Sequence, residues 1–137
     1  MGEVRAMVVL TNAADLAMMR RKLLKPSKVR KLEVDALVDT GAVALVVPSA
    51  VAQRLGLARP FTHMAEYADG RREEVGVTEA VLVEIAGRQT QDEALVLGDE
   101  VIIGQTVLEK TDLHVDCTGR RLIPNPAHPD QPVVKIK

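Results

Sequence analysis

The sequence predicts a mostly β protein with two or three short helices. Short aliphatic runs, many of them β-branched, recur along the 137-residue chain and either alternate with polar residues or stay apolar throughout. Two turn signals, Asp69-Gly70 and Gly87-Arg88, separate such runs and indicate β-hairpins. The chain is long enough to bury a substantial core, and we expect residues 1–137 to form a single domain.

The N-terminal third predicts a strand, a helix and a second strand. Residues 4–12 have the composition of a strand. Residues 13–24 follow with helical spacing of apolar residues, with Asp15 early and basic residues late, as the helix dipole prefers. Pro26 is expected to end that helix. Residues 31–41 first alternate and then become apolar, as in a strand that enters the core.

The middle of the chain continues the strand pattern. Residues 42–47 predict a second buried strand, and residues 48–57 predict a short helix with Ser49 as its N-cap and Gly56 just past its end. Residues 61–97 are rich in strand-forming runs that the two hairpin turns divide.

The C-terminal part predicts one more helix and a hairpin. A short helix is expected around residues 106–110 and a hairpin that turns at Thr118-Gly119. The segment 125–132 holds three of the seven prolines and is expected to be extended, and residues 133–137 alternate like an edge strand.

Composition excludes several classes of function. The net charge of −1 argues neither for nucleic acid nor for an acidic partner, and Phe61 and Tyr67 are the only aromatic residues that could stack on bases. Cys117 is the single cysteine, so no intrachain disulfide can form. The first ten residues carry charges where a signal peptide needs apolar residues, and the longest uncharged stretch, residues 40–53, is too short to span a bilayer. We expect a cytoplasmic, soluble protein without a membrane or nucleic-acid partner.

The sequence also gives no indication of a metal or another cofactor. The single cysteine has no cysteine partner, and the histidines lack the spacing of metal ligands. The three histidines are His63, His114 and His128.

One motif stands out, "LVDTGAVALVVP" at residues 37–48. A carboxylate in an apolar run is costly unless it is paired, hydrogen-bonded or used chemically. Asp39, Thr40 and Gly41 can form a plain Asx turn, because Asp and Thr side chains bind nearby backbone and glycine accepts any φ. The apolar strands on both sides favour the alternative, a catalytic carboxylate.

With "VIIG" at residues 101–104, the chain resembles the retropepsin-like aspartic proteases, the one-domain relatives of the retroviral proteases. The resemblance covers residues 32–123, leaving an N-terminal segment of 1–31 and a Pro-rich tail of 124–137 outside it. The helix at residues 48–57 is more typical of cellular and bacterial members than of viral ones. The resemblance implies a closed, barrel-like acid-protease fold.

The resemblance also implies a set of site residues. Asp39 is the expected catalytic residue, in an active-site loop completed by Thr40, Gly41 and Ala42. A second loop of Ile102, Ile103 and Gly104 is expected to pass close behind the first, with Gly104 allowing the close approach. A glycine-bearing hairpin is expected to form a flap over the substrate, with its tip at Ala68, Asp69 and Gly70.

This family hydrolyses peptides with two carboxyl groups that share a proton. The chain has only one such motif, so the pair requires Asp39 from each of two copies and therefore a homodimer. The function expected is that of a homodimeric aspartic endopeptidase acting on an extended peptide, with pockets for aliphatic or small side chains. The alternative is a dimer of the same fold that binds peptide or protein and cleaves slowly or not at all.

Overall fold

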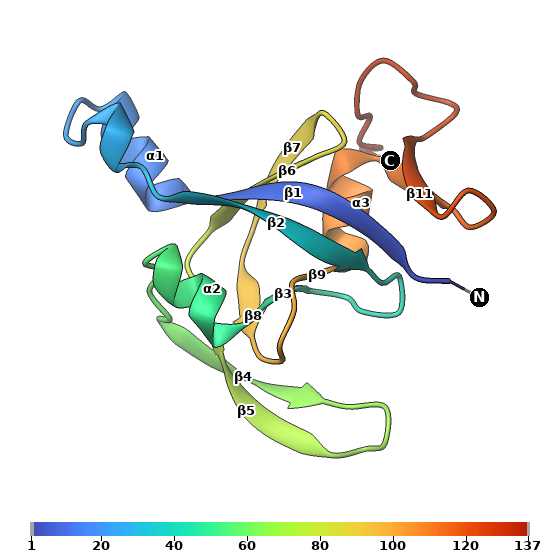
Figure 1. Cartoon of the computed structure of the whole chain (residues 1–137), viewed down its shortest axis with the longest axis horizontal. Helices are drawn as coiled ribbons and strands as arrows, with labels where there is room; N and C mark the ends of the chain where they lie inside the picture. Colours follow the sequence, from blue (N-terminus) through green and yellow to red (C-terminus); the bar gives the residue numbers. More distant parts are fainter. Residues whose placement is uncertain (1, 137) are drawn as a thin grey trace.

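The computed structural model describes residues 2–136, which form two β-sheets and three α-helices (Figure 1). The N-terminal elements are β1 (Val4–Asn12), α1 (Ala13–Arg20), the 3-10 helix η1 (Pro26–Lys28), β2 (Lys31–Val38), β3 (Leu45–Val47) and α2 (Ser49–Arg54). The central elements are β4 (Phe61–Glu66), β5 (Arg72–Val77), β6 (Val81–Ile85), β7 (Arg88–Asp92) and β8 (Ala94–Val96). The C-terminal elements are β9 (Ile102–Ile103), α3 (Gln105–Thr111), β10 (Leu113–Asp116) and β11 (Arg121–Pro124).

The larger sheet has the strand order β4-β5-β8-β3-β9-β2-β1-β6-β7. Near its middle, β2 and β9 run parallel, with Leu37 opposite Ile102 and Val38 opposite Ile103. Parallel neighbours end at the same edge of a sheet. The chain therefore leaves β2 at Asp39 beside the point where it leaves β9 at Gly104, which brings two distant motifs together.

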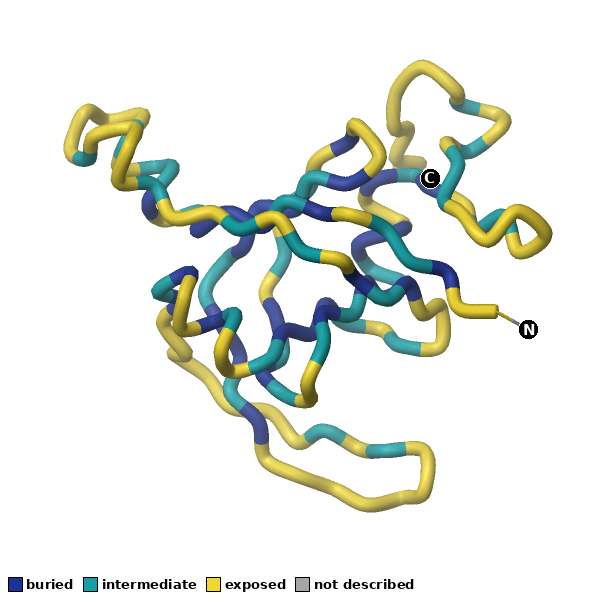
Figure 2. The backbone as a smooth tube through the Cα atoms, viewed as in Figure 1, coloured by how far each residue is buried: buried dark blue, intermediate teal, exposed yellow. Residues whose placement is uncertain are grey.

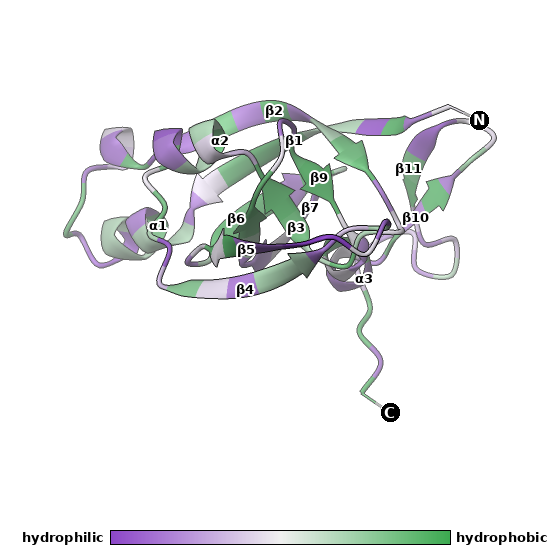
Figure 3. Ribbon diagram, turned by 90° about the horizontal axis from the view of Figure 1, so that it is seen from below, coloured by the Kyte–Doolittle hydropathy of each residue, from purple (hydrophilic) through white to green (hydrophobic). Residues whose placement is uncertain are grey.

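The core is built from aliphatic side chains. Leu10, Leu45, Val83 and Ile103 are fully buried, and the central strands are the most hydrophobic part of the fold (Figure 3). Phe61 contributes little to this core, since it is 58% exposed on the β4–β5 hairpin. Branched aliphatic residues suit this role because they pack well on a pleated, buried surface.

The first helix is shorter than the sequence predicts, because α1 ends at Arg20 instead of continuing toward the proline. Lys22 takes a left-handed conformation with φ of 61°. Its N–H donates to the Met19 carbonyl (2.9 Å), and the Leu23 N–H donates to the Met18 carbonyl (2.8 Å). This is the Schellman arrangement that ends helices, here with lysine where glycine is usual.

The second helix begins differently from the prediction. Ser49 is the first residue of α2 and not its N-cap, a position that Pro48 takes without a side-chain hydrogen bond. The Ser49 hydroxyl instead accepts a hydrogen bond from Arg59 (3.1 Å). At the other end, Gly56 lies just past the helix as predicted, with φ of 62°.

The mostly β fold with short helices is confirmed, and so are the helix over residues 106–110 and the hairpin at 118–119. The larger sheet does not close into a barrel, since β4 and β7 remain its two open edges. The edge strand expected at residues 133–137 is wrong for the described residues 133–136, and residue 137 lies outside them. Within residues 2–136, no helix is long and apolar enough to cross a membrane.

Asp112 fastens the Pro-rich tail to the body of the protein. It follows α3 in a left-handed conformation, and its carboxylate accepts hydrogen bonds from Asn125 Nδ2 (2.9 Å) and the Val133 N–H (3.1 Å). His128 Nδ1 lies 2.6 Å from the same carboxylate. These hydrogen bonds lower the pKa of Asp112 to about 2. The bond from Asn125 has the largest effect, followed by those from Val133 and His128.

A buried arginine completes this attachment. The Arg88 guanidinium donates to the backbone carbonyls of Thr111 (3.0 Å) and Asp112 (2.9 Å) at the end of α3. It also donates to the His128 carbonyl in the tail (2.8 Å). Hairpin β6–β7, helix α3 and the tail are thus joined at one point.

We predict that the tail attachment weakens in acid. The pKa of Asp112 is lower in the folded protein than the value of about 4 in an unfolded chain. Its stabilising contribution is therefore complete above about pH 4 and is lost as the pH falls through about 2. An NMR titration of the Asp112 carboxyl carbon should show a midpoint near 2, with the Val133 amide resonance moving at the same pH.

The control is Asp130→Asn, which removes a tail carboxylate that makes no hydrogen bond among residues 2–136. It should leave the Val133 titration unchanged, whereas Asp112→Asn should abolish it. An Asp112 midpoint near the ordinary value of about 4 would contradict the attachment.

Candidate active site

Asp39 lies in an exposed position directly after β2, a strand of which only Ala36 and Val38 near its end are buried. Val38 is buried, whereas Asp39 and Thr40 are exposed in the single chain. The Gly41 N–H donates to Asp39 Oδ1 (2.9 Å), and the Ala42 N–H donates to the Asp39 carbonyl (3.1 Å). The Asx turn is therefore present. It occupies only one carboxylate oxygen, since Oδ2 accepts no hydrogen bond from residues 2–136.

The loop that follows Asp39 is held by the start of α3. The Gln105 N–H donates to the Ala42 carbonyl (2.8 Å), and the Thr106 N–H donates to the Val43 carbonyl (3.0 Å). The first N–H groups of a helix have no partner within the helix, so these loop carbonyls satisfy them. The same bonds explain why β3 begins at Leu45 and not at the predicted residue 42.

Gly104 allows this contact. A side chain at Gly104 would place its Cβ 2.8 Å from the Val43 carbonyl oxygen and 2.9 Å from that of Ala42, and closer still to the oxygen of Ala44. No Cβ fits against backbone at such distances. In addition, the Asp39 N–H donates to the Ile103 carbonyl (3.0 Å), so both loops are joined at both ends.

An ion-pair cluster holds the segment before β9 against β1. Arg5 donates to Glu100 (3.0 Å) and to Asp35 on β2 (2.8 Å). These hydrogen bonds raise the pKa of Arg5 above its usual range, and the bond with Asp35 has the largest effect, followed by that with Glu100. The cluster spans β1, β2 and the chain entering β9, which are the elements that carry Asp39 and Gly104.

The candidate flap is a long, exposed hairpin of β4 and β5 that projects from the body (Figures 1 and 2). At its tip, Gly70 has φ of 85° and donates its N–H to the Tyr67 carbonyl (2.8 Å). Asp69 accepts a hydrogen bond from the Arg71 N–H (2.9 Å), and Ala68 is exposed beside it. Within residues 2–136, no hydrogen bond joins this tip to the Asp39 loop.

The tip is tied together by its own side chains. The Arg71 guanidinium lies 4.4 Å from the centroid of the Tyr67 ring, and the Tyr67 hydroxyl donates to Glu73 (2.8 Å). This hydrogen bond to the Glu73 carboxylate raises the pKa of the Tyr67 hydroxyl.

Two small pockets adjoin the Asp39 loop. One, of about 130 Å³, lies between Val43 and Ala44 of the loop and His63 of β4. The other, of about 220 Å³, lies between Thr40 and His114 of β10. The hairpin and the loop therefore share a pocket, although the tip makes no hydrogen bond to the loop.

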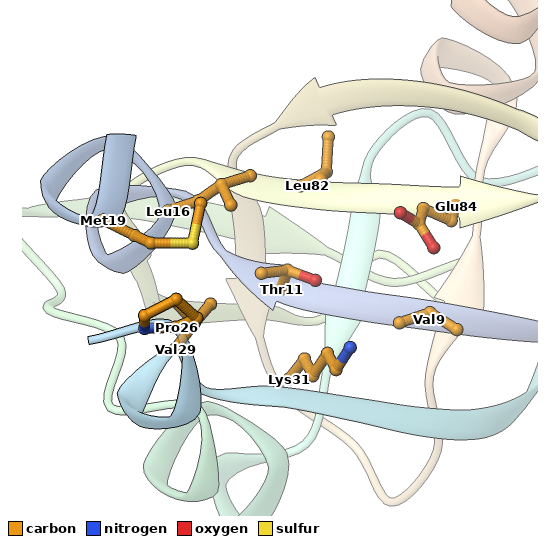
Figure 4. Close-up of a pocket in the computed structure, with 9 residues that line it drawn as sticks. All are labelled: Val9, Thr11, Leu16, Met19, Pro26, Val29, Lys31, Leu82 and Glu84. Carbon is orange, nitrogen blue, oxygen red and sulfur yellow. The ribbon is translucent and has the colours of Figure 1, made fainter. Parts of the chain in front are cut away.

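A larger pocket of about 270 Å³ lies elsewhere, between α1, η1 and the strands β1, β2 and β6 (Figure 4). Leu16, Met19 and Pro26 gather at one end of it, and Lys31 and Glu84 line the other (Figure 4). No predicted site residue lines this pocket. Among residues 2–136, no group of three or more His, Cys, Asp or Glu side chains could hold a metal ion.

The structure brings the two predicted loops together and leaves the hairpin tip apart from them. Sequence reasoning missed the Arg5–Glu100 pair, which has no local signal because it joins residues far apart in the chain. It also missed the hydrogen bond from the Thr106 hydroxyl to Asp92 (2.8 Å), which connects α3 to the end of β7.

We predict that Gly104→Ala destabilises the protein by about 1–3 kcal/mol, because the added methyl group overpacks three backbone carbonyls. Urea unfolding would measure the change. The control is Gly76→Ala on β5, where the added Cβ meets only the flexible side chain of Arg59 and should change stability by less than about 1 kcal/mol. Equal effects of the two substitutions would argue against tight packing of the loops.

Comparison with known proteins identifies the family. The model of the gag-polyprotein putative aspartyl protease family matches residues 26–110, which include both predicted loops. Among solved structures, the solution structure of the Simian Foamy Virus (mac) protease is 17% identical, with a TM-score of 0.47, and the match covers 76% of this chain and 90% of that one. No curated protein matches the chain. Because the family model spans more than half of the sequence, the chain belongs to the gag-polyprotein putative aspartyl proteases and is a retropepsin-like aspartic protease.

Proposed function

We propose that the protein is a homodimeric aspartic endopeptidase in which Asp39 from each of two copies activates a water molecule. The observation that carries this proposal is the Asp39-Thr40-Gly41 loop, exposed at the end of β2 and fixed by the start of α3. A loop held by three backbone hydrogen bonds gives Asp39 a defined position, which acid–base catalysis requires.

The reaction needs one ionised and one protonated carboxyl group. The ionised carboxylate takes a proton from water, and the water oxygen attacks the carbonyl carbon of the scissile peptide bond. The protonated carboxyl donates a hydrogen bond to the carbonyl oxygen and polarises it. The carboxyl group that took the proton from water then donates it to the nitrogen as the C–N bond breaks, so the pair again holds a single proton. Two carboxyl groups about 3 Å apart hold a single proton between them, as in known aspartic proteases.

A second copy supplies the partner carboxyl group, because the sequence holds a single motif of this kind. Asp39 is exposed, and its Oδ2 accepts no hydrogen bond from residues 2–136, which supports this arrangement. A two-fold axis beside Asp39 would give the isologous interface that is commonest among dimers.

The hairpin of β4 and β5 would cover an extended peptide, with Ala68, Asp69 and Gly70 at its tip. β4 is an edge strand of the larger sheet, and so it presents unpaired backbone groups along one side. A peptide in extended form could satisfy such groups by adding a strand. Gly41 would let the backbone approach the substrate because it has no side chain, and Ala42 would line the bed of the site with a single methyl group.

We predict that Asp39→Asn abolishes cleavage, with a loss of at least about 10²- to 10⁴-fold, because an amide cannot take the proton from water. A peptide library incubated between about pH 4 and about pH 7.5 would be read for new termini by mass spectrometry. Asp99→Asn is the control: it removes an exposed carboxylate that precedes the second loop, and it should leave the cuts in place.

Cuts that persist in Asp39→Asn would contradict the proposed function. If the folded, dimeric wild type makes no cuts at any pH, the alternative of a peptide-binding module without turnover would be favoured. Asp39→Asn should then still bind peptide.

A further inference from the structure

The pocket between the Asp39 loop and the hairpin has no role in the chemistry described above. Its walls are largely apolar and come from the Asp39 loop and the strands β5 and β8, namely Val43, Ala44, Val77, Ala94 and Leu95. At about 130 Å³, it is smaller than the roughly 300–1,000 Å³ of pockets that hold separate small molecules. Its size therefore suits a single side chain of a bound peptide.

Asp92, which also lines the pocket, is held by two polar contacts, and its charge is compensated. Asp92 accepts a hydrogen bond from the Thr106 hydroxyl (2.8 Å), and its other carboxylate oxygen lies 3.5 Å from Lys110 Nζ. Asp92 and Lys110 largely cancel each other's charge, so Asp92 shapes the pocket without giving it a strong field.

Glu93 provides the uncompensated charge. It lines the same pocket and is exposed, and its carboxylate forms no hydrogen bond or ion pair with residues 2–136. His63 of β4 lines the pocket as well. A side chain entering between the apolar walls would therefore meet a free carboxylate.

We propose that this pocket binds a lysine or arginine side chain of the substrate, with the aliphatic stem against Val43 and Leu95 and the cationic end at Glu93. Long cationic side chains combine an apolar stem with a charged head, which matches this lining. The inference rests on the proposed function, because it takes the bound peptide to lie along the Asp39 loop. It changes the expectation of aliphatic or small side chains at this one pocket.

The two-fold arrangement gives a specific consequence. Each copy contributes one such pocket, so the preference for basic residues should occur at one position on each side of the cut. Alternate side chains of an extended peptide point to the same face, so the pocket would select at a fixed spacing from the scissile bond.

The test compares cleavage of a proteome-derived peptide library by the wild type, Glu93→Gln, Glu93→Lys and the control Glu33→Gln. Glu33 is an exposed glutamate on β2 that does not line the pocket. The wild type and Glu33→Gln should show Lys or Arg enriched about threefold at one position on each side of the cut, the size expected of an exposed ion pair. Glu93→Gln should lose the enrichment, and Glu93→Lys should favour Asp or Glu there.

Failure of this inference differs from failure of the proposed function. Cuts that depend on Asp39 but lack basic enrichment, or that keep it in Glu93→Gln, would overturn the pocket assignment and leave the protease intact. If the wild type cuts nothing, binding would be measured instead by the change in the amide NMR shifts of Val43, Ala44 and Ala94. Two hexapeptide mixtures would be compared, one with lysine and one with norleucine at a fixed position. Larger shifts with lysine that require Glu93 would support the assignment, and equal shifts would overturn it.

Discussion

The backbone contact between the Asp39 loop and the start of α3 is the constraint on which the rest of the site depends. The carbonyls of Ala42 and Val43 accept the first free N–H groups of the helix, and Gly104 leaves room for the approach. One set of hydrogen bonds thus ends the loop, begins the helix and shortens β3. Because these hydrogen bonds supply partners for backbone groups on both segments, a shift of either segment would leave such groups unpaired on the other.

Helix α3 transmits this constraint outward. At its start, Thr106 donates its N–H to the Val43 carbonyl and its hydroxyl to Asp92, so the helix connects the Asp39 loop to the proposed substrate pocket. At its end, Asp112 and Arg88 attach the tail. A helix of seven residues has little stability of its own. Its position comes from these contacts at both ends, and the precision of the site follows from them.

Much of the fold, and the contact between the two predicted loops, could be predicted because their signals are local. The apolar strands, the Asp39-Thr40-Gly41 loop and the "VIIG" segment are each a continuous stretch of sequence. The glycine in each of the two motifs is required for a conformational or steric reason. The missed features depend on contacts between distant residues. Arg5 lies close enough to Glu100 to form an ion pair only when β1, β2 and β9 have paired. The early end of α1 depends on Lys22 taking a left-handed conformation that usually requires glycine. The open sheet and the attached tail are likewise properties of tertiary packing.

The most direct measurement of whether two copies of Asp39 form one site is the activity of mixed dimers. Wild-type and Asp39→Asn chains would be mixed at constant total concentration and allowed to exchange, and native mass spectrometry would check that mixed dimers form in the statistical proportion. If each site needs both carboxyl groups, activity should follow the square of the wild-type fraction, with about one quarter remaining in an equal mixture. Activity that falls in direct proportion to the wild-type fraction would show that a single Asp39 suffices and would contradict the paired site.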